Sequence, residues 1–182
     1  SQQFQLIVGI LLIFTSLILL IAYISFLFNG ANDMSIIEQG TTRKAMREGV
    51  TNALGLPGAV IASWLVDSMF GILVVLPIIL LGVYALKILF NFEWKGWKIF
   101  FCSLFCMLWG AIALGFIQQL IPTSSFFRWG GAFGEHIAIL AISYIQALGL
   151  GLTLLVTLII FAIVADKHFV DHCQQFGAWV AN

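Results

Sequence analysis

Apolar residues fill four long stretches of this sequence, and short polar segments separate them. A helix needs about 20 apolar residues to cross the hydrocarbon core of a bilayer, which is about 30 Å thick, at about 1.5 Å per residue. Each stretch reaches that length, and none shows the alternation of a barrel strand. The pattern therefore predicts four transmembrane helices, at residues 4–28, 70–89, 99–121 and 136–165.

The predicted outer loop between the first two spans, residues 29–69, has a pattern of its own. Apolar residues from Met46 to Leu54 recur at helical spacing beside charged residues. This spacing predicts a short amphipathic helix on the membrane surface.

The apolar character of the second span begins near Ala59, too early for a single crossing. We expect this stretch to divide at Asp67, because a carboxylate is costly at the membrane centre and cheap at its edge. Residues 59–66 then form an interfacial piece, with Trp64 at the level of the headgroups. Pro77 removes a backbone donor inside the second span and predicts a kink there.

The composition is that of a membrane domain. The 182 residues are 62% hydrophobic and 9% charged, whereas about 25% of the residues in a soluble domain are charged. Eight basic and eight acidic residues cancel, so no overall field draws the chain to nucleic acid. We therefore predict an all-α bundle, a single domain over residues 1–182, with a juxtamembrane segment at 166–182 and no direct nucleic-acid binding.

Basic residues are divided equally between the two sides that four spans define. Lys87, Lys95, Lys98 and Lys167 lie on the side of the termini, and Arg43, Lys44, Arg47 and Arg128 lie on the other. Three of the lysines crowd the short second connection, where the positive-inside rule acts most strongly. This distribution favours cytoplasmic termini.

No catalytic or cofactor-binding pattern occurs in the sequence. There is no Gly-rich phosphate loop, and the three histidines lie at span ends, away from any Ser, His and Asp arrangement. We therefore expect no enzymatic activity and no cofactor. One cluster after the fourth span has the residue types of a metal site, including two histidines four residues apart that would share one face of a helix. Its members are Asp166, His168, Asp171, His172 and Cys173. The alternative interpretation is a polar segment that leaves the membrane, without a metal.

Asp67, Glu135 and Gln146 are the polar residues that an ion or proton path would use. Asp67 and Glu135 lie at predicted span edges, and Arg128 is on the same side as both. A structural ion pair at the membrane interface is the favoured interpretation, and an ion path is the alternative.

Small residues at fourfold spacing allow transmembrane helices to approach closely. Two such rows predict packing seams, in the third and fourth spans: Cys102, Cys106 and Gly110, and Ser143, Ala147 and Gly151. The position of the first two cysteines inside a hydrophobic stretch argues against a secreted disulfide framework.

Two glycine- and proline-containing stretches resemble a known family. They are Asn52, Leu54–Ala59, Asp67, Phe70, Gly71 and Pro77, and then Gly130, Gly131, Phe133, Gly134, Gly149 and Gly151. Together they are similar to the amino-terminal four-transmembrane domain of FtsK/SpoIIIE-type bacterial DNA translocases. Within that family the sequence most resembles those of Bacteroidetes. The resemblance covers nearly the whole chain.

The resemblance implies a membrane anchor in the bacterial inner membrane, at the division septum, with both termini cytoplasmic. It also implies a cytoplasmic hexameric motor, through which the chain forms a homo-oligomer, and contacts with other divisome proteins. The nucleotide motifs of that motor do not occur in these 182 residues, so the enzymatic role is not transferred. The alternative function is a small four-span transporter or channel subunit, which is expected to need charges or broken helices near the midplane.

Overall fold

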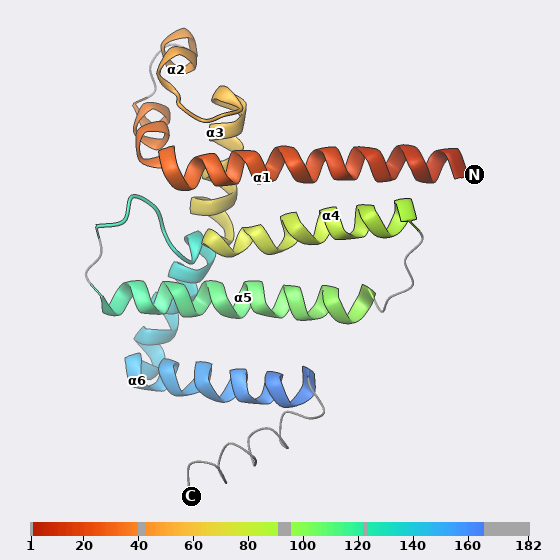
Figure 1. The fold of residues 1–182 in the computed structure, drawn as a ribbon. Helices are drawn as coiled ribbons and strands as arrows, with labels where there is room; N and C mark the ends of the chain where they lie inside the picture. The colour runs from red at the N-terminus through yellow and green to blue at the C-terminus, as the bar shows by residue number, and fades with distance from the viewer. Residues whose placement is uncertain (1, 40–42, 91–95, 122–123, 166–182) are drawn as a thin grey trace, which may run out of the picture. The chain divides into compact units, whose positions relative to one another are not determined.

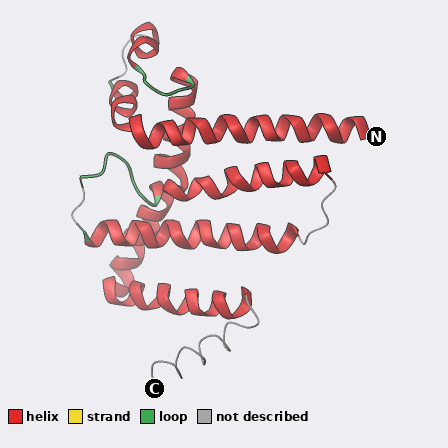
Figure 2. Cartoon of the chain, in the orientation of Figure 1, coloured by secondary structure: helices red, strands yellow, loops and turns green. Residues whose placement is uncertain are grey.

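The computed structural model describes residues 2–39, 43–90, 96–121 and 124–165. These residues form helices and connecting turns, without a strand among them (Figures 1 and 2). Four helical segments are long and apolar enough to cross a membrane. The prediction of an all-α protein with four membrane-spanning segments is confirmed.

The first helix, α1, is longer than the predicted span of residues 4–28. It runs over Gln2–Glu38, 37 residues, which at about 1.5 Å per residue is far longer than a crossing needs. The predicted outer segment, residues 29–69, is helical over more of its length than expected. It contains the end of α1, α2 at Arg43–Gly49 and α3 at Gly55–Ser63. Helix α2 contains Met46 of the expected amphipathic helix but ends at Gly49, so Val50, Ala53 and Leu54 lie beyond it.

The second apolar segment changes helix type three times and breaks once. After α3 come a π-helical turn, η1 (Trp64–Phe70), a 3-10 turn, η2 (Gly71–Val74), and α4 (Val75–Phe90). The break is at Gly71, whose φ of 68° and ψ of −149° are not helical, and it lies four residues beyond the expected division at Asp67. The helical run after it, residues 71–90, is long enough for one crossing.

The kink expected at Pro77 is wrong. Pro77 is the third residue of α4, which continues directly from η2, and no non-helical residue interrupts α4 at or after Pro77. Glycine at position 71 makes the bend instead, since it adopts a positive φ without steric cost.

The third and fourth spans differ in continuity. Helix α5 runs over Gly96–Leu120, and α6 runs over Gly131–Ala165 with a non-helical residue, Gln146, inside it. The φ of 63° and ψ of 168° at Gln146 interrupt the predicted span of 136–165. Residues 147–165 alone rise about 28 Å, enough for one crossing.

The two halves of the described chain, residues 2–90 and residues 96–165, repeat the same sequence of local conformations. A glycine with a φ of 65° opens α3, and one with a φ of 64° opens α6. Each helix then breaks at a residue of positive φ, Gly71 or Gln146, and continues as a segment of spanning length. The same residue types recur after each opening glycine: Gly55, Gly58, Ile61 and Ala62, and Gly131, Gly134, Ile137 and Ala138. The backbone conformation and the sequence thus repeat together.

The chain divides into two compact units, residues up to Ile139 and residues from Leu140. In the first unit α4 packs along α1, and α5 along α4 (Figure 1). Its core joins α1 to both sides of the break at Gly71 and consists of Ala22, Tyr23, Phe26, Ala62, Val66, Val74 and Ile78. Many large apolar side chains outside this core are exposed, as expected where lipid covers them.

Candidate functional site

The first unit has two chemically distinct ends, which we name the polar end and the lysine end. The polar end contains the end of α1, helices α2 and α3, and residues 124–131. The lysine end contains the start of α1, the end of α4 with Lys87, and the start of α5 with Lys98. Contacts of Gly9 with Leu89 fix this antiparallel arrangement of α1 and α4.

An ionic cluster at the polar end joins η1, the connection after α5 and the start of α6. Arg128 donates to Asp67 through Nη2 at 2.5 Å, through Nε at 3.3 Å and through its backbone N–H at 2.9 Å. Its Nη1 also lies 3.5 Å from Oε2 of Glu135. The hydrogen bond with Asp67 raises the pKa of the Arg128 guanidinium above its ordinary value, and the charges of Asp67 and Glu135 act in the same direction. The structure thus brings together all three charged residues that the sequence placed on one side.

Backbones cross closely beside this cluster. The N–H of Ile72 donates to the carbonyl of Trp129 at 3.1 Å. A Cβ at Gly71 would collide with that carbonyl, and a Cβ at Gly131 would collide with Met69 O and lie 2.5 Å from the N of Gly71. These glycines therefore permit the start of α6 to lie against the break after η1.

Helix α5 joins the same crossing. A Cβ at Gly130 or at Gly134 would collide with the carbonyl of Ala111, and one at Gly115 would lie 2.5 Å from the backbone of Gly134. Further along α5, Oε1 of Gln118 accepts a 2.8 Å hydrogen bond from the N–H of Trp129. The glycines at 130, 131 and 134 thus serve one crossing of three segments.

Sequence reasoning missed a second polar cluster, around Asp33. Asp33 is 0% exposed, and its Oδ1 accepts hydrogen bonds from the backbone N–H of Thr51 at 2.7 Å and from its hydroxyl at 3.0 Å. Oδ2 has no hydrogen-bond partner among the described residues. Asn32 donates to Gly49 O at 3.1 Å. The absence of proline between residues 29 and 38 was the signal that the helix continues to Asp33.

Neighbouring polar groups fasten the segment between α2 and α3 to the middle of α1. Asn52 donates to the carbonyl of Ala22 at 3.2 Å, and the hydroxyl of Ser25 accepts from the N–H of Ala53 at 2.9 Å. The polar end is therefore an ordered structure built by hydrogen bonds to α1.

The predicted packing seams are corrected in part. In the fourth span the break at Gln146 lies between Ser143 and Ala147, so Ser143, Ala147 and Gly151 do not form one continuous helical row. In the third span a Cβ at Gly110 would meet the side chain of Leu73, whereas Cys106 is exposed. Neither Cys102 nor Cys106 is in a disulfide.

The metal candidates His168, His172 and Cys173, with Asp166 and Asp171, lie outside the described residues. Among the residues that are described, no group of three His, Cys, Asp or Glu side chains is placed to hold a metal ion. His136 is exposed and its Nδ1 lies 2.6 Å from the carbonyl of Ala132.

Comparison with known proteins identifies the family. No curated protein and no solved structure matches the chain. The family described as the 4TM region of DNA translocase FtsK/SpoIIIE matches residues 1–180. Coverage of this extent, together with four helices long enough to span a membrane, shows that the chain belongs to the four-transmembrane family of FtsK/SpoIIIE DNA translocases.

Proposed function

We propose that this membrane-anchoring domain tethers a cytoplasmic DNA-translocating motor to the division septum and contacts other divisome membrane proteins there. The observation that supports it is the polar end, where hydrogen bonds and ion pairs order residues 49–54 and 124–131 against the spans. An ordered surface of this kind offers partner proteins a preformed contact, which lowers the entropic cost of binding.

The position of the helix breaks argues against the transporter alternative. Broken helices in transporters place binding groups near the bilayer midplane. Here Gly71 and Gln146 are each followed by a segment of about 20 residues, residues 71–90 and 147–165. Each segment is long enough to cross the hydrocarbon alone, so the breaks fall at the membrane edge. Asp67, beside the first break, is paired with Arg128.

The proposed orientation places the lysine end in the cytoplasm, in agreement with the positive-inside rule. The polar end is then outside the cytoplasmic membrane, where it would meet the outer segments of other division proteins. The motor joins on the side of the lysine end.

The test is a fluorescent fusion of these 182 residues, without a motor, in dividing bacterial cells. We expect enrichment at the septum. The variant Arg128→Ala, which loses both ion pairs, should insert in the membrane but lose enrichment. Lys98→Gln, which removes one positive charge at the lysine end, away from the proposed contact surface, is the matched control and should stay enriched. Uniform membrane fluorescence of the unmodified fusion would reject septal recruitment by this domain.

A further inference from the structure

The helical segment before the first break is one residue longer than the segment before the second. Each segment opens at a glycine of positive φ and ends at a residue of positive φ. Gly71 lies 16 positions after Gly55, whereas Gln146 lies 15 positions after Gly131. One residue has therefore been added to the first segment or removed from the second.

The extra residue lies in the π-helical turn η1. The residue types that the two halves share keep equal spacing as far as Ala62 and Ala138, so the difference arises after these residues. The next segment of the first half is η1, whereas α6 is α-helical up to Gln146. A π-turn closes its hydrogen bond over one residue more than an α-turn. A single inserted residue thus accounts for both the longer spacing and the wide turn.

The wide turn changes the direction in which Asp67 points. In a continuous α-helix Asp67 would share a face with Val60, because seven residues complete two turns to within about 20°. That face is exposed and apolar: Val60 is 45% exposed, and Ile61 and Trp64 beside it are exposed as well. An inserted residue turns the residues after it back by up to about 100°, the angle of one residue. The side chain of Asp67 is only 13% exposed, so it has left the face of Val60.

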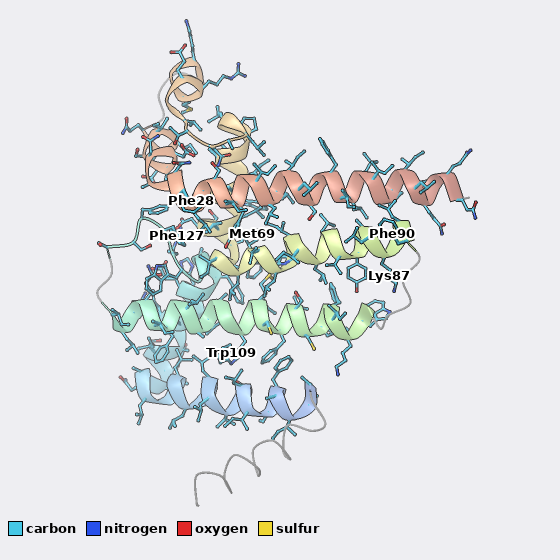
Figure 3. The ribbon with its side chains drawn as sticks, in the orientation of Figure 1. Phe28, Met69, Lys87, Phe90, Trp109 and Phe127 are labelled. Carbon is cyan, nitrogen blue, oxygen red and sulfur yellow. The ribbon has the colours of Figure 1, made fainter. Side chains whose placement is uncertain are left out.

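In this direction Asp67 meets the connection after α5. Its Oδ1 accepts hydrogen bonds from the backbone N–H and the Nε of Arg128, and its Oδ2 accepts one from Nη2. Met69 and Phe127, labelled in Figure 3, belong to the two segments that this contact joins. Single π-turns inside helices recur at functional sites. We propose that η1 carries a one-residue insertion whose role is to bring Asp67 against Arg128 and so to hold the connection after α5 at the polar end.

The test compares two single-residue deletions by unfolding in mixed detergent and dodecyl sulfate, followed by circular dichroism. Deletion of Ser68, which is exposed, should let η1 become α-helical, so that the domain stays folded and loses only the contact of Asp67. The folding equilibrium constant should fall by about 5- to 30-fold. Deletion of Tyr144, the same position in the second half and 80% exposed, is the matched control. It should lower that constant further, because the α-helix there has no wide turn to absorb the change. Equal effects of the two deletions, or loss of folding without Ser68, would overturn the insertion.

A double-variant comparison tests the role of Asp67 separately. In the unmodified chain Asp67→Asn should lower the folding equilibrium constant by about 5- to 30-fold. In the chain that lacks Ser68 the same substitution should change it by less than about 2-fold, because the contact with Arg128 is already lost. If the substitution kept its full effect there, the wide turn would not be what positions Asp67. Both measurements are of stability in detergent, so their outcome does not depend on recruitment to the septum.

Discussion

Replacing Gln146 by glycine tests the break in α6. Gln146 has a φ of 63° and a ψ of 168°, in a region of backbone space that is almost exclusive to glycine. The corresponding break in the first half has glycine in that place, Gly71, with a φ of 68°. Gln146→Gly should therefore relieve strain and stabilise the folded domain.

The magnitude follows from two opposing terms. A residue held in this region costs about 1–3 kcal/mol, which glycine recovers. Glycine also raises the entropy of the unfolded chain, at a cost of about 0.5–1 kcal/mol. The expected net gain in the free energy of unfolding is about 0–2.5 kcal/mol. The side chain of Gln146 is exposed, so its loss alone should change stability by less than about 0.5 kcal/mol.

The assay is unfolding in mixed detergent and dodecyl sulfate, followed by circular dichroism. Gln146→Ala is the matched control, since it removes the same side chain but keeps a Cβ and hence the strain. If α6 were continuous at residue 146, glycine would instead be less stable than alanine by about 1 kcal/mol. The sign of the difference in unfolding free energy between the two variants distinguishes a broken from a continuous α6. An alanine variant more stable than the glycine variant would refute the break.

Three further predictions concern the polar end. Gly131→Ala should lower the free energy of unfolding by about 1–3 kcal/mol, because its Cβ collides with Met69 O. Gly55→Ala, with a similar φ but open space around it, should lower it by about 1 kcal/mol. Chemical unfolding of both variants measures the difference. Asp67→Asn should cost about 1–2 kcal/mol and leave proton flux in liposomes at background, and a flux in the parent that the variant abolishes would favour the transporter. A cysteine placed at Ser35, in a chain without native cysteines, should react with impermeant reagent outside intact cells and one at Lys98 should not; the opposite pattern would reverse the orientation.

Hydropathy was sufficient to find the spans, because a helix in lipid needs a long apolar run whatever surrounds it. It failed at the end of α1, where polar residues up to Glu38 remain helical. Tertiary hydrogen bonds from Thr51 to Asp33 stabilise that extension, and no local pattern reports them. The pairing of Asp67 with Arg128 was accessible because topology alone places both residues at one membrane edge.

The breaks were harder to predict. Pro77 is the strongest local breaker in the second span, yet α4 continues through it. The non-helical residue is Gly71, against which Trp129 and Gly131 pack. Gln146 has no local signal, since glutamine seldom adopts its conformation. The sequence clue that was available is the repeat of residue types between the two halves: Gly55, Gly58, Ile61 and Ala62, and Gly131, Gly134, Ile137 and Ala138.

The repeated plan of the two halves has a consequence for how such a domain is made and how it evolves. Each half contains two of the four helical segments that are long and apolar enough to cross a membrane, so the unit that repeats is a pair of spans. Duplicating a hairpin preserves the sidedness of everything encoded after it, whereas duplicating a single span would invert it. During synthesis the first pair completes its contacts only after the second pair has arrived, because Arg128 donates to Asp67 and the N–H of Ile72 donates to the carbonyl of Trp129.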